Sequence, residues 1–103
     1  MPDPYPAFIF GMHDRGGEHL MLDKNKPGWV LVTEEVGGDP NNYGGNSYTD
    51  LSNQGLGVIV RINYGYGSTG TIPFTDQYDN FAKRCGNFVE ASSGCHIWII
   101  GNE

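Results

Sequence analysis

Four short apolar runs recur along the chain, and they constrain its fold more than any other feature. The runs are AFIFG at 7–11, WVLVT at 29–33, LGVIVRIN at 56–63 and HIWII at 96–100. Each is nearly continuous in apolar residues and does not alternate with polar ones, a pattern typical of parallel strands covered on both faces. We therefore expect four buried parallel strands.

The segments between these runs carry helix signals. Residues 17–23 are expected to form a short helix, and residues 48–55 one or two helical turns closed by a glycine. Residues 76–91 repeat apolar side chains at helical spacing, with Thr75 as the expected N-cap. The predicted order is β-α-β-α-β-α-β, which is an α/β fold. No linker divides the 103 residues, so one domain over 1–103 is expected.

Charge and composition narrow the classes of partner. The net charge is −6 with only six lysines and arginines, which argues against nucleic acid and anionic membranes as partners. No apolar run approaches the ~20 residues of a membrane span, and no signal peptide is visible, so a soluble protein is expected. Neutral ligands such as sugars are compatible with this charge. The loops GGDPNNYGGNS and NYGYGSTG are rich in glycine, asparagine and tyrosine. They either take part in ligand recognition or are ordinary surface loops without a binding role.

Polar side chains follow each predicted strand. In parallel α/β folds the C-terminal ends of the strands meet at one rim, where functional residues gather. The residues at these ends are His13–Asp14, Glu34–Glu35, Asn63–Tyr64 with Tyr66, and Asn102–Glu103. This rim is the predicted site.

Metal and phosphate sites are less well supported by the sequence. His13, Asp14 and Glu35 could together hold a divalent ion, but the three histidines share no close ligand spacing. The GYGSTG loop has Gly-x-Gly spacing without the lysine of a phosphate loop. We therefore expect no metal and no other cofactor.

Several side chains keep two interpretations. Arg61, inside the third run, either pairs with a rim carboxylate such as Glu35 or reaches solvent. Cys85 and Cys95 form either a disulfide or two free thiols. Trp29 is expected in the core in preference to a sugar platform.

The closing stretch WIIGNE resembles the fourth strand of retaining (β/α)8-barrel glycoside hydrolases, which ends in Asn-Glu. The stretches PGWVLVTEEVG, GLGVIVRINYGYG and FAKRCGNFVEASSGCHIWIIGNE are also similar to the first half of a bacterial glycoside-hydrolase-like barrel family. The resemblance implies half of a TIM barrel, with Glu103 as general acid/base and Asn102 on the sugar 2-hydroxyl. It implies carbohydrate contacts for the remaining rim side chains, namely His13, Asp14, Glu35, Asn63, Tyr64 and Tyr66.

The chain departs from these enzymes in one respect. A retaining glycosidase needs a second carboxylate about 5–5.5 Å from the first, and the resembling enzymes carry it on their seventh strand. Four strands also leave bare edges and an uncovered inner face. We therefore expect self-association, as a homodimer or a higher homo-oligomer, and a two-fold dimer is the form that would close or mimic a barrel. The competing architecture is a self-contained, flavodoxin-like sheet with helices on both faces.

Three functions follow from these patterns. The first is hydrolysis of glycosidic bonds by a half-barrel that binds carbohydrate. The second is a non-catalytic carbohydrate-binding or structural half-barrel. The third is an unrelated small α/β module with a metal or another enzymatic role. Loss of activity in Glu103→Gln distinguishes the first, and loss of stability with a chelator distinguishes the third.

Overall fold

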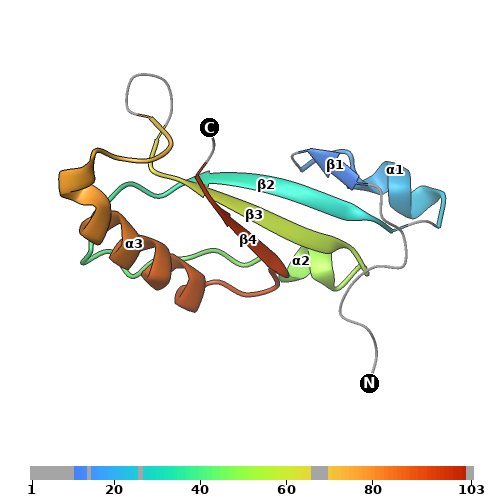
Figure 1. Cartoon of the computed structure of the whole chain (residues 1–103). Coiled ribbons are helices and arrows are strands. Elements are labelled where there is room, and N and C mark those ends of the chain that lie inside the picture. The colour runs from blue at the N-terminus through green and yellow to red at the C-terminus, as the bar shows by residue number, and fades with distance from the viewer. Residues whose placement is uncertain (1–10, 14, 26, 66–69, 102–103) are drawn as a thin grey trace.

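A single parallel sheet organises the chain (Figure 1). The computed structural model describes residues 11–13, 15–25, 27–65 and 70–101. Within these ranges four strands lie in the order β1-β2-β3-β4, and every neighbouring pair is parallel. The strands are β1 (Gly11–His13), β2 (Trp29–Glu35), β3 (Gly57–Asn63) and β4 (Ile97–Ile100). The predicted α/β class and the four parallel strands are confirmed. Residues 7–10 of the first predicted strand lie outside the described residues.

Helical segments connect the strands where the sequence predicts them. They are α1 (Glu18–Asp23), α2 (Thr49–Ser52), the 3-10 turn η2 (Thr75–Gln77) and α3 (Tyr78–Ala91). The predicted N-cap at Thr75 is wrong. Thr75 opens η2, and the cap position of α3 is Gln77, whose side chain makes no capping hydrogen bond. The extra 3-10 turn moves the start of the α-helix two residues downstream, from 76 to Tyr78.

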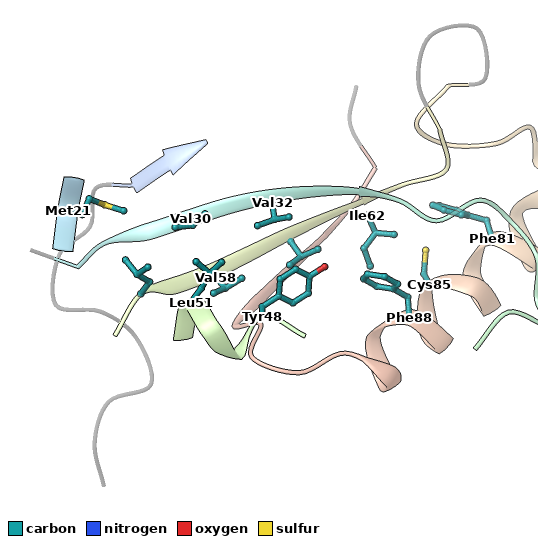
Figure 2. Packing of buried hydrophobic residues seen from close by; sticks show 12 residues of the cluster. Met21, Val30, Val32, Tyr48, Leu51, Val58, Ile62, Phe81, Cys85 and Phe88 are labelled. Carbon is teal, nitrogen blue, oxygen red and sulfur yellow. The ribbon is translucent and has the colours of Figure 1, made fainter. Parts of the chain in front are cut away.

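One hydrophobic core lies between the sheet and the helices (Figure 2). The strands contribute Val30, Val32, Val58, Val60 and Ile62, of which all but Val32 have no exposed surface. The helices contribute Met21, Leu51, Phe81, Cys85 and Phe88. Phe81, Cys85 and Phe88 are spaced by four and three residues, which places them on one face of α3. The helical spacing of these apolar residues therefore identifies the side of α3 that packs against the sheet.

No helix of the described residues lies over the opposite side of the sheet (Figure 1). Side chains alternate between the two faces of a strand, so the residues between the core valines point to this second side. We call it the open face; it carries Trp29, Leu31, Thr33 and Glu35 of β2, Ile59, Arg61 and Asn63 of β3, and Ile97 and Ile99 of β4. Ile97 and Ile99 remain 39% and 38% exposed. The expectation that the strands are covered on both faces is therefore wrong for this chain.

The strand order separates the two predicted architectures. A flavodoxin-like sheet winds in two directions and has helices on both faces, whereas these four strands follow one another in chain order with helices on one face. Sequential parallel strands with helices outside are the arrangement of a TIM barrel. The chain thus has the form of half a (β/α)8 barrel, and the open face corresponds to the inside of the barrel.

Two smaller findings complete the fold. Cys85 and Cys95 are both free, so the disulfide interpretation is wrong. Over the described ranges, no helix is both long and apolar enough to cross a membrane.

Candidate functional site

The C-terminal ends of β2, β3 and β4 meet at one edge of the sheet, which we call the rim. Glu35 ends β2 directly beside Asn63, which ends β3. The Gly101 N–H donates a hydrogen bond to the Ile62 carbonyl at 2.7 Å, so the chain leaving β4 is still next to β3 at this point. Parallel pairing therefore brings Glu35, Asn63 and Gly101 to the same edge. Asn102 and Glu103 follow Gly101 in sequence and lie outside the described residues.

His13 does not belong to this cluster. β1 pairs with the first half of β2, and His13 is in register with Leu31. Leu31 lies four residues before Glu35, so His13 is roughly 13 Å along the sheet from the rim position of β2. Asp14 lies outside the described residues. The pairing of His13 with Glu35 in a metal site is thus wrong, and among the described residues no group of three metal-binding side chains occurs.

Tyr64 faces away from the predicted sugar site. Its ring meets the ring of Phe81 on α3 edge to face, with centroids 5.8 Å apart. It is also a partly buried neighbour of the hydrophobic core. Tyr64 therefore supports α3, and the structure does not bring it together with Glu35 and Asn63. Tyr66 lies outside the described residues.

Two polar side chains of the open face lack partners. Asn63 is fully buried, and neither its Oδ1 nor its Nδ2 makes a hydrogen bond. Arg61 is half-buried, and its Nε is buried without a partner. No hydrogen bond or ion pair joins Arg61 to Glu35, so neither interpretation of Arg61 holds in full. Buried unpaired polar groups usually cost free energy, and they concentrate at functional sites.

The other arginines of the chain are paired. Arg15 forms an exposed ion pair with Asp50. Arg84 is buried and donates to the carbonyls of Val36, Asn42 and Gly44, at 3.2, 3.3 and 2.8 Å. Arg61 is therefore exceptional among the three arginines.

A shallow hollow of about 390 Å³ opens over β1 and the first halves of β2 and β3, away from the rim. It is lined by Gly11, Met12, His13, Trp29, Leu31 and Ile59. Three of these residues, Trp29, Leu31 and Ile59, belong to the open face, and the hollow corresponds to space that the opposite wall would fill in a complete barrel. Trp29 lines this hollow and is only half-buried, so its expected place in the core is wrong. Its ring packs over Gly57 instead, where an added Cβ would come within 2.4 Å of the indole.

The long loop after β2 is bound to α3, a feature that the sequence reasoning missed. Besides the three bonds from Arg84, the Asn87 side chain donates to the carbonyls of Pro40 and Asn42, at 3.0 and 3.1 Å. The loop then passes Ser92, whose Oγ accepts from the Asn46 N–H at 3.0 Å. A signal for this was the pair Arg84 and Asn87, polar residues next to the apolar stripe of the helix. The loop is mainly structural, although Tyr43 within it is 69% exposed.

Burial shifts the acidity of three groups away from the rim. It raises the pKa of the Cys85 and Cys95 thiols, so both stay protonated at neutral pH and are poor nucleophiles. It raises the pKa of Tyr48 to about 12. None of these groups suits acid–base chemistry near neutral pH.

Among the described residues, the rim thus has one carboxylate, Glu35, and one buried amide, Asn63, with the unpaired guanidinium of Arg61 beneath them. Hydrogen-bonding groups beside an apolar floor suit a small polar ligand with an apolar side. Comparisons with protein-family models, curated proteins and solved structures return no match.

Proposed function

We propose that this chain is a carbohydrate-binding half-barrel that hydrolyses glycosidic bonds at its rim, with Glu103 as general acid/base. The observation that supports this most directly is the sequential parallel sheet with helices on one face. In that architecture, chemistry belongs at the C-terminal ends of the strands. Asn102 and Glu103 come directly after Gly101, which is bonded to the end of β3.

The rim offers contacts for a sugar. The Asn63 amide has two unused hydrogen-bonding atoms, and the Glu35 carboxylate is exposed beside it. An asparagine at position 102 matches the residue that contacts the sugar 2-hydroxyl in the enzymes that WIIGNE resembles. Under this proposal Asn102 and Asn63 bind hydroxyl groups, and Glu103 transfers the proton to the leaving oxygen.

Substitution of the proposed acid tests the proposal. We expect wild-type protein to hydrolyse one or more members of a panel of nitrophenyl glycosides. Glu103→Gln should lower kcat by about 100-fold or more, since a general acid contributes on the order of 10² to 10⁴. Glu90→Gln is the matched control, because Glu90 is an exposed acid on α3. Equal rates for the two variants would exclude Glu103 as the acid.

A second function is a half-barrel that binds carbohydrate without cleaving it. It is favoured by the shortage of carboxylates on the open face, where Glu35 is the one acid that the described strands supply. A retaining mechanism needs two. In this case the wild type would bind sugars in calorimetry without turnover, and Glu103→Gln would bind them equally well.

We also propose that a second copy of the chain covers the open face. β1 and β4 are the edges of the sheet, and all strands run in the same direction. A two-fold axis parallel to the strands would place β4 of one copy beside β1 of the other, twice, and give eight parallel strands. The rims of both copies would then lie at the same end of the barrel, and a carboxylate from the partner's rim could supply the second acid.

A further inference from the structure

Arg61 is positioned as a receptor for a negative charge. It lies on the open face between Thr33 of β2 and Ile99 of β4, in register with both. Its Nε is buried and unpaired, and no carboxylate of a described residue is bonded to it. A guanidinium that is half removed from water, without a counter-charge, is most strongly stabilised by an incoming anion.

Asn63 gives an independent indication of a ligand at the same place. It lies two residues after Arg61 on the same face of β3, towards the rim, and it is fully buried with both side-chain polar atoms unpaired. An amide of this kind has a donor and an acceptor to offer. The Thr33 hydroxyl side chain stands across from Arg61 on the neighbouring strand.

The charge of the molecule limits the kind of anion. One guanidinium neutralises one negative charge, and the net charge of −6 repels polyanions at long range. The planar fork of an arginine matches two oxygens of a carboxylate or of a phosphate, but a phosphate monoester carries nearly two negative charges at neutral pH. A ligand with a single carboxylate therefore fits better than a phosphate or a sulfated polymer.

From these observations we infer that the site takes an acidic sugar, a uronate, whose carboxylate binds Arg61. The inference rests on the proposed carbohydrate function and names its substrate class. The sugar ring lies towards the rim, where Asn63 bonds the carboxylate or a neighbouring hydroxyl. A neutral sugar leaves Arg61 unpaired and loses the charge-assisted bonds.

Two sugars that differ at one carbon test this inference. D-glucuronate carries a carboxylate where D-glucose carries a hydroxymethyl group, so their affinities can be compared by calorimetry or ligand-observed NMR. We expect wild-type protein to bind glucuronate about tenfold or more tightly than glucose, the difference expected of a charge-assisted pair. Sodium acetate, a carboxylate without the sugar, should bind more weakly than glucuronate.

Arginine variants locate the effect. Arg61→Met should remove the preference for glucuronate, whereas Arg15→Met should keep it, because Arg15 pairs with Asp50 and lies outside the open face. If circular dichroism shows that Arg61→Met does not fold, Arg61→Lys serves instead. Arg61→Lys keeps the charge without the fork and should reduce the preference.

The possible results separate the inference from the function on which it rests. Equal affinity of the wild type for glucose and glucuronate overturns the uronate assignment and leaves carbohydrate binding intact. Binding of acetate as tight as that of glucuronate overturns it in favour of a general anion site. Absence of binding by either sugar overturns both. A glucuronate preference that survives in the Arg61 variants overturns the role of Arg61.

Discussion

Unpaired buried polar atoms occur in two environments, and the environment decides what each residue does. Arg61 and Asn63 lie on the open face, where a ligand or partner can reach the half-buried Arg61, and the fully buried Asn63 lies two residues further along β3. The Tyr48 hydroxyl is also buried without a partner, but Tyr48 belongs to the hydrophobic core between the sheet and the helices (Figure 2). We attribute function to the first two and only a structural cost to the third.

This difference predicts that Tyr48→Phe stabilises the protein. The substitution keeps the ring in the core and removes a hydroxyl that is buried without a hydrogen bond. We expect the free energy of unfolding to rise by about 1 kcal/mol, since an unsatisfied buried polar group costs on the order of 1–3 kcal/mol. Urea denaturation at pH 7 measures the change. A loss of stability instead would mean that the hydroxyl is paired.

The pH dependence of the same variant provides a control. Burial raises the pKa of Tyr48 to about 12 in the folded protein, from 10.0. The stability that this shift contributes is complete below pH 10 and is lost as the pH rises from 10 to about 12, because only the unfolded state ionises readily there. The wild type should therefore lose more stability than Tyr48→Phe over this interval. Parallel curves for the two proteins would contradict the shift.

At the scale of elements, the spacing of apolar residues predicted the positions of the main strands and of the long helix. The strands at 29–35 and 57–63 and the helix α3 lie where the sequence patterns place them. The apolar runs did not reveal the open face, because the residues on that side, such as Leu31, Ile59 and Ile99, are as apolar as the core valines on the other. A half-barrel and a fully covered sheet therefore have similar strand sequences.

The register between neighbouring strands is the second feature that the sequence could not predict. The sequence places polar residues after every apolar run but does not say how far each strand is shifted along its neighbour. His13 pairs with Leu31 and therefore lies far from the rim. Glu35 pairs with Asn63, and these two residues form the rim. Of the candidate site, only the β2–β3 part could be predicted within the described residues.

The attachment of the loop to α3 yields a prediction at this scale. Arg84→Met removes the three hydrogen bonds that hold the carbonyls of Val36, Asn42 and Gly44. We expect the free energy of unfolding to fall by about 3 kcal/mol, because bonds to a charged donor contribute roughly 1.5–3 kcal/mol each and water replaces some of them. Faster proteolytic cleavage within 37–46 should accompany the loss.

Lys83→Met is the matched control for that experiment. Lys83 is the preceding residue of α3, is exposed, and carries the same charge. Its replacement should leave both stability and cleavage nearly unchanged. If the two variants behaved alike, the loop would not depend on Arg84.

At the scale of the whole molecule, the open face is the feature that needs a partner. The sheet has apolar side chains on both sides, but the helices of the described part of the chain cover only one of them (Figure 1). Ile97 and Ile99 are exposed on the edge strand β4, and such apolar side chains beside an open strand edge favour association. In a two-fold pair the two Arg61 side chains would project from opposite walls of the barrel and repel each other. The anion that we propose at this site would offset that repulsion.

Closure by a second copy predicts a dimer that depends on the open face. Light scattering over a concentration series should give twice the mass of the chain at micromolar concentration. Ile99→Lys should shift the mass towards the monomer, because Ile99 lies on the open face at edge strand β4, where the partner would cover it and a lysine would be buried unpaired. Leu20→Lys is the control, since Leu20 is 56% exposed on α1, on the helical side. A monomeric wild type would exclude self-closure, and a dimer that both lysine variants retain would place the interface elsewhere.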